Sequence, residues 1–194
     1  MKAFLKKYSY TAVKLFLNQF AIALFGVGLA FASEGANNKT LLMATSIGAI
    51  LFYLFLQYAV MWEVGAKDGI SAVARGESRG LWRGFAIGGL ANAFNLLCAF
   101  FILPGAFAAS DSGLRIMGNA FQFIARMVQG MYMGVMTAPF RGLQLHDFAW
   151  VYFVITLPAI LVCGVSYIIG SYNLHATNIL IPKNKDVKNN GRPE

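Results

Sequence analysis

The chain has 194 residues, of which 58% are hydrophobic and only 12% are charged, and its formal net charge is +8. Soluble domains carry about 25% charged residues, so this composition excludes an ordinary soluble domain and indicates a bilayer protein. The excess Lys and Arg residues lie at the ends of apolar segments, and no basic-aromatic nucleic-acid motif is present. We therefore expect the lipid bilayer and its anionic lipids as partners, and no nucleic acid.

Four long apolar segments predict transmembrane helices, because backbone groups in lipid must pair within the protein. They cover about residues 15–32, 40–62, 84–109 and 148–170. The first also has the features of a secretory signal peptide that would end at Ala30-Phe31-Ala32, and this alternative stays open. We expect residues 1–182 to form a single multi-pass helical membrane domain. The polar residues 183–194 have the composition of a disordered tail.

Residues 113–138 form a further helical pattern, which is amphipathic rather than uniformly apolar. Polar side chains recur there at steps of four and three residues, which places them on one narrow helix face: Arg115, Asn119, Gln122, Arg126 and Gln129. Apolar side chains fill the opposite, wider face. Such a helix either lies at the membrane surface, re-enters the bilayer, or crosses it with the polar stripe toward a protein interior or a water-filled path.

The distribution of basic residues favours four crossings over five. With the N-terminus in the cytoplasm, four crossings leave the basic lead, the 63–83 loop and the basic tail on the inner side. A fifth crossing would move the tail outside and leave Arg126 in the bilayer, at a cost of about 2.5–3.5 kcal/mol. We therefore predict an all-α integral protein of the cell membrane, a bundle of four transmembrane helices plus an interfacial or re-entrant amphipathic helix, with both termini cytoplasmic. Five transmembrane helices are the alternative.

Polar residues and prolines inside or beside the apolar segments make further predictions. Three arginines spaced four apart would share one edge of a helix and contact lipid headgroups or a partner, although an ordinary basic loop also explains them: Arg75, Arg79 and Arg83. Asn92 and Asn95 share a face, so we expect an interhelical hydrogen bond or a solute contact. Pro104 is expected to end or kink its helix, and Pro158 to kink the last one.

Motifs of the common enzyme classes are absent from the sequence. It contains no phosphate-binding loop, no dinucleotide-binding glycine pattern, no nucleophile elbow and no zinc-protease motif. The two cysteines, Cys98 and Cys163, lie within apolar segments, where Cys usually packs as a small hydrophobic residue. We therefore predict no enzymatic activity, no cofactor and no metal site.

Two functional hypotheses follow. The first is a non-enzymatic membrane subunit, assembly factor or regulatory module, in a homo-oligomer or with another membrane subunit. Small-residue pairs that permit close helix contact support it, namely Gly84 with Gly88 and Gly130 with Gly134. The alternative is a small transporter, channel or solute-binding component for a polar or anionic solute. Its polar path would consist of Arg115, Asn119, Gln122, Arg126 and Gln129, with Asn92 and Asn95 opposite. The size of the chain and its Lys- and Asn-rich ends favour a bacterial cell membrane.

Overall fold

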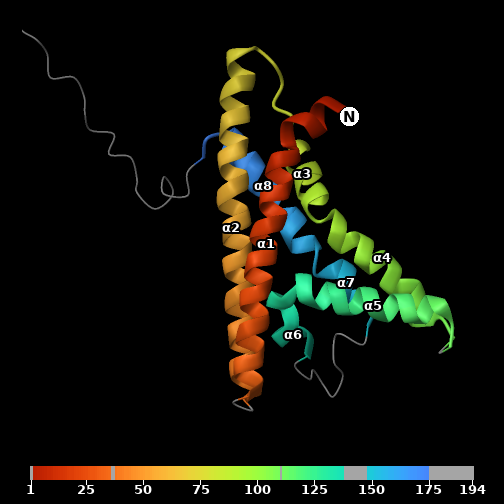
Figure 1. The fold of residues 1–194 in the computed structure, drawn as a ribbon. Coiled ribbons are helices and arrows are strands. Elements are labelled where there is room, and N and C mark those ends of the chain that lie inside the picture. Colours follow the sequence, from red (N-terminus) through yellow and green to blue (C-terminus); the bar gives the residue numbers. More distant parts are fainter. Residues whose placement is uncertain (1, 36–37, 110, 138–147, 175–194) are drawn as a thin grey trace, which may run out of the picture.

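The computed structural model describes residues 2–35, 38–109, 111–137 and 148–174, which form helices joined by short turns (Figure 1). Two long antiparallel helices, α1 (Lys2–Gly35) and α2 (Lys39–Ala74), make up one side of the molecule. The last helix, α8 (Leu157–Ser171), packs against α2. The described ends of the chain lie at the same end of the bundle (Figure 1). The predicted tail 183–194 lies outside the described residues.

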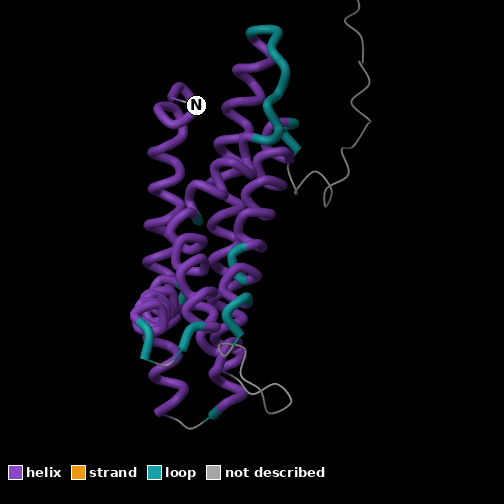
Figure 2. Tube along the Cα trace, turned by 90° about the vertical axis from the view of Figure 1, so that its right-hand side faces the viewer, coloured by secondary structure: helices purple, strands orange, loops and turns teal. Residues whose placement is uncertain are grey.

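The middle of the chain leaves this bundle and returns to it. Helix α3 (Arg83–Ala91) packs between α1 and α8, and α4 (Ala93–Phe107) then slopes away from the bundle. Helix α5 (Gly113–Val128) runs back crosswise to α1, and Figure 2 shows it almost end-on. Three short helices complete the described chain: η1 (Gly130–Tyr132), α6 (Met133–Thr137) and α7 (Val151–Val154).

Three of the helical segments are long and apolar enough to cross a membrane: Lys2–Ser33, Lys39–Ala74 and Val151–Ser171. Helices α3 and α4 would together make a fourth, although they are bent by 60°. Helix α5 does not meet the same criteria of length and composition. Among the described residues, the prediction of an all-helical fold with three to four segments of membrane-spanning length is therefore confirmed.

Charge-free segments of α1 and α2 lie side by side. Residues 15–33 and 40–62 contain no charged side chain; at 1.5 Å per residue the shorter of them is about 28 Å long. The Tyr53 hydroxyl donates to Gln19 Oε1 at 3.3 Å, which fixes the pairing of the two helices. Leu15 and Ala23 of α1 are fully buried, so this segment of α1 packs within the bundle.

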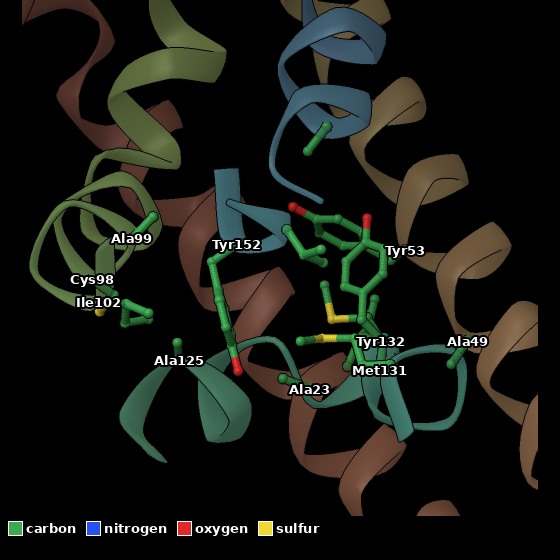
Figure 3. Packing of buried hydrophobic residues seen from close by; sticks show 14 residues of the cluster. Ala23, Ala49, Tyr53, Cys98, Ala99, Ile102, Ala125, Met131, Tyr132 and Tyr152 are labelled. Carbon is green, nitrogen blue, oxygen red and sulfur yellow. The ribbon is translucent and has the colours of Figure 1, made fainter. Parts of the chain in front are cut away.

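Two apolar clusters are separated by a layer of buried amides. One cluster includes Leu15, Met61 and Tyr167, and the other surrounds Tyr53 and Tyr132, as Figure 3 shows. Between them along the helices lie four buried side chains: Gln19, Gln57, Asn92 and Asn95. Polar side chains in an apolar interior must find partners, so this layer fixes how the helices pair.

The sharp bend between α3 and α4 lies at Asn92. The Asn92 side chain donates from Nδ2 to the carbonyl of Gly88 at 3.0 Å, and thus competes with the helical backbone where two glycines already weaken it. Pro104 lies inside α4, which continues to Phe107. The helix therefore does not end at Pro104, and the 60° bend of this segment lies at Asn92 instead.

Two other predicted helices are interrupted. The pattern over 113–138 ends as a regular helix at Val128, because Gly130 packs against the Ala23 carbonyl of α1 and the chain turns there to follow the bundle. The last segment is interrupted at Ile155 and Thr156, directly ahead of Pro158, whose missing N–H removes a helical hydrogen bond. The kink expected at Pro158 corresponds to this interruption, whereas the pattern over 113–138 gives no sign of a break after Val128.

Arg75, Arg79 and Arg83 do not share the edge of one helix, and the other interpretation, a basic loop, describes the segment between α2 and α3. Helix α2 extends past Trp62 to Ala74, and Gly76 then adopts a positive φ of 65° that ends it. The three arginines point to different neighbours. Arg75 caps α2, Arg79 lies over the ring of Tyr172 at 4.4 Å from its centroid, and Arg83 begins α3.

Candidate functional site: a polar pocket between α4 and α5

Helix α5 is held against α4 by local packing. Ser112 caps its first turn by accepting from the backbone N–H of Arg115 at 3.3 Å. Farther along, the rings of Phe101 and Phe121 stack with centroids 4.6 Å apart. The backbones approach most closely where Gly105 faces Gly118, and a Cβ at either glycine would collide with the other. The small residues therefore allow a tight pair, which turns the polar stripe of α5 toward its neighbours.

The polar stripe lines a pocket of about 390 Å³. Ile102, Gly105 and Ala106 of α4 form one wall, and Ala149, just ahead of α7, also lines the pocket. The polar lining consists of Arg115, Asn119, Gln122 and Arg126. The opposite face of α5 is apolar and exposed: Leu114, Ile116, Phe123, Ile124 and Met127. The predicted stripe thus faces other helices, and the wide apolar face points outward.

Two arginines give the pocket its charge. Arg115 donates from Nη1 to the Ala106 carbonyl at the end of α4, at 3.1 Å. Arg126 donates from Nε to the Tyr152 hydroxyl at 3.4 Å, and Tyr152 is only 1% exposed. Figure 3 shows the Tyr152 ring reaching from α7 toward α5 beside Ala125. Among the described residues that line the pocket there is no Asp or Glu, so the pocket is electropositive.

The pocket lies level with the middle of the charge-free segments. At its C-terminal end α5 meets α1: Gln19 donates from Nε2 to the Val128 carbonyl at 3.3 Å, and Gly130 packs against Ala23. Along α1, Ala23 is about 12 Å from Leu15 and about 15 Å from Ser33 at 1.5 Å per residue. Since α5 runs crosswise to α1, the whole helix lies close to this level (Figures 1 and 2).

Asn92, Asn95 and Gln129, the other predicted path residues, do not line the pocket, and the two asparagines belong to the buried amide layer. Asn95 donates from Nδ2 to Gln19 Oε1 at 3.0 Å and to Asn92 Oδ1 at 2.9 Å. The expected interhelical hydrogen bond is therefore present. Gln129 is 2% exposed, and neither of its side-chain amide atoms has a hydrogen-bond partner within the described part of the chain. Of the seven residues of the predicted path, four therefore line the pocket, two belong to the amide layer, and Gln129 is buried apart from both.

Sequence reasoning missed a cluster around Asp68, beyond the charge-free segment of α2. The Asp68 carboxylate accepts from Lys7 at 2.6 Å and from the hydroxyls of Tyr8 and Tyr167, the latter at 2.8 Å. Burial raises the pKa of Asp68, but hydrogen bonds from Lys7 and the two tyrosines outweigh it and hold the pKa below its ordinary value. Three helices therefore meet at one carboxylate. The sequence signal that could have revealed this cluster is the acid Asp68 in α2, which pairs with the adjacent Lys7 and Tyr8 of α1.

Comparison of the chain with known protein families, curated proteins and solved structures gave no match. The chemistry of the pocket is therefore the basis for a functional assignment. Within the described residues, no three His, Cys, Asp or Glu side chains come together as metal ligands would. The pocket lining offers guanidinium and amide donors, which suit the binding of a polar or anionic group.

Proposed function

We propose that this chain is an integral membrane protein that binds a polar or anionic solute in the pocket between α4 and α5. The observation that carries the proposal is the pocket itself: two arginines and two amides lie level with the middle of the charge-free segments of α1 and α2. An arginine at mid-bilayer costs about 2.5–3.5 kcal/mol on insertion scales, so such residues usually mark a binding site or a water-filled path.

Four crossings fit this arrangement. Helices α1 and α2 cross once each, α3 to α6 cross together as a broken span, and α7 with α8 crosses back. Irregular backbone at membrane depth is tolerated where it is buried in protein or lines a cavity, which describes the bend at Asn92 and the break after Val128. Helix α5 then re-enters the bilayer rather than resting at its surface.

The orientation follows from the described charges. One end of the bundle carries a group of basic side chains from α1, α2 and the 75–83 segment, whereas Lys39 lies at the other end. The positive-inside rule places the basic end, with the described ends of the chain, in the cytoplasm.

A binding role, in transport or in regulation, fits better than catalysis. None of the described residues that line the pocket is a nucleophile or a general base at neutral pH. The glycine pairs that had suggested a partner subunit pack within the chain instead: Gly84 and Gly88 face Tyr167 and Cys163, and Gly134 faces the Leu42 carbonyl. Their close packing therefore no longer supports an external partner.

Cysteine accessibility tests the proposal. Asn119→Cys places a thiol in the pocket, and Ile116→Cys places one on the exposed apolar face of the same helix as a matched control. In proteoliposomes, a water-soluble thiol reagent should label N119C and leave I116C and the wild-type cysteines unlabelled. An N119C thiol that stays unlabelled while I116C reacts would contradict a water-accessible pocket in the membrane.

The class of ligand is identified by which added solutes protect the N119C thiol from labelling. Inorganic phosphate and sulfate are suitable probes, and either should slow the labelling of N119C if the pocket binds anions. Arg126→Gln in the same background removes a charged donor, which is worth about 1.5–3 kcal/mol, so the protecting concentration should rise about tenfold or more. Arg126→Lys should restore part of the protection, because the charge remains but the two-pronged donor is lost. Protection that is identical in the Arg126→Gln variant would refute the assignment.

A further inference from the structure

A second, separate cleft lies between α1 and α2 at the basic end of the bundle. It has a volume of about 350 Å³. Its charged lining consists of Lys7, Lys14 and Lys67 with Glu63 and Asp68, and its apolar lining includes Val60 and Val64. None of its lining residues belongs to the pocket between α4 and α5.

The charges in this cleft leave one positive charge in excess. Lys7 pairs with Asp68 at 2.6 Å, and Lys67 pairs with Glu63, also at 2.6 Å. The third lysine, Lys14, is exposed and also attracts Glu63, and no third acid lines the cleft among the described residues. A net charge of one complements a monoanion such as a phosphodiester, whereas a cleft with balanced charges would not prefer an anion.

The level of the cleft indicates where its ligand comes from. Lys14 and Glu63 are the first charged residues beyond the charge-free segments of α1 and α2. In a bilayer that spans those segments, this level is the layer of lipid phosphates, and Val60, on the bilayer side of Glu63, lies at the start of the acyl chains. Leu17, three residues along α1 from Lys14 toward the middle of the charge-free segment, is 57% exposed and extends the apolar surface that way.

We propose that this cleft binds the phosphodiester of an anionic phospholipid from the cytoplasmic leaflet. Lys14 supplies the charge in excess, Lys7 and Lys67 supply further donors at the rim, and the acyl chains lie along the apolar surface below. A single excess charge on an exposed surface holds a free phosphate weakly in salt. A lipid phosphate is already concentrated at this level, so the lipid is the occupant that the site suits.

Native mass spectrometry of the detergent-solubilised full chain, titrated with phosphatidylglycerol, tests the proposal. Lys14→Gln removes the excess charge; a basic residue near an anionic surface contributes enough to change affinity about fivefold, so binding should weaken by that factor. Glu63→Gln releases Lys67 and should tighten binding by a similar factor. Lys6→Gln is the matched control, because Lys6 is exposed on the same helix and does not line the cleft.

Opposite effects of Lys14→Gln and Glu63→Gln, with Lys6→Gln unchanged, would support the site. Equal weakening by Lys14→Gln and Lys6→Gln would overturn it, because it would show diffuse attraction to a basic surface. Displacement of the lipid by inorganic phosphate at similar concentration would also overturn it, in favour of a soluble anion. Arg126→Gln should leave phosphatidylglycerol binding at this cleft unchanged, so its result is independent of the pocket between α4 and α5.

Discussion

Replacement of Asp68 by Ala should destabilise the bundle more than any other single change at its basic end. The Asp68 side chain is 10% exposed and accepts hydrogen bonds from Lys7 and Tyr8 of α1 and from Tyr167 of α8. Without the carboxylate, both tyrosine hydroxyls lose a charged acceptor, and α1 loses its polar link to α2 and α8 at this level.

The expected loss is about 3 kcal/mol. Hydrogen bonds to a charged group contribute about 1.5–3 kcal/mol each, and the lower value fits two tyrosines at a partly hydrated site. The Lys7 side chain is 48% exposed, so its ion pair adds less than about 1 kcal/mol. For a chain of this size, about 3 kcal/mol corresponds to a decrease of about 6–12 °C in Tm. Asp68→Asn should cost about half as much, because its amide oxygen still accepts one hydroxyl, and Lys7→Gln should have the smallest effect.

Thermal unfolding of the detergent-solubilised protein measures these differences, and pH gives a second readout. Because the pKa of Asp68 is lowered in the folded protein, its contribution is complete above its ordinary value of 3.8 and is lost as the pH falls through the folded pKa. The Tm difference between wild type and Asp68→Asn should therefore be constant near neutral pH and shrink below about 3.8. If Asp68→Ala lowers Tm no more than Lys7→Gln does, the carboxylate is not the junction of the three helices.

Two further changes test the packing of the bundle. Gln19→Leu should lower the free energy of unfolding by about 1–3 kcal/mol, because Asn95 and Tyr53 lose their shared partner Gln19 Oε1. In a double-mutant cycle, the double variant with Asn95→Leu should lose less stability than the sum of the two single variants. Gly65→Ala should cost about 1–3 kcal/mol, because its Cβ would collide with the Tyr167 carbonyl of α8. Gly48→Ala in the same helix is the control, because its Cβ meets no neighbour, and it should be neutral or slightly stabilising. Thermal unfolding compares the two variants. Equal effects at both glycines would contradict the close contact of α2 with α8.

The sequence predicted the elements better than their directions. Hydropathy located the apolar parts of α1, α2 and α8, and helical periodicity placed Arg115, Asn119, Gln122 and Arg126 on one face. Periodicity continues through Gln129, however, and gives no sign that the helix ends there. The end depends on the contact of Gly130 with the Ala23 carbonyl, which joins residues far apart in the sequence. A pattern within one segment holds no information about such a contact.

The bend at Asn92 shows the same limit. Asn92 and Asn95 were recognised as buried amides, but the sequence offered no way to know that Asn92 would bind the Gly88 carbonyl of its own helix. Proline is the stronger helix breaker in isolation, so Pro104 was the obvious position. In the structure the bend lies where two glycines and a side-chain hydrogen bond coincide, and Pro104 is accommodated within α4.

The bend and the pocket depend on one another. Helix α4 has room to slope away from the bundle only because Asn92 releases it from the axis of α3, and Asn95 then ties the start of α4 to Gln19 of α1. Helix α5 returns to α1 at the level that Gln19 also fixes, through its hydrogen bond to the Val128 carbonyl. The buried Gln19 side chain therefore holds both the start of α4 and the end of α5 against α1. The amide layer, which contributes no group to the pocket, determines that a pocket with two arginines exists at this depth.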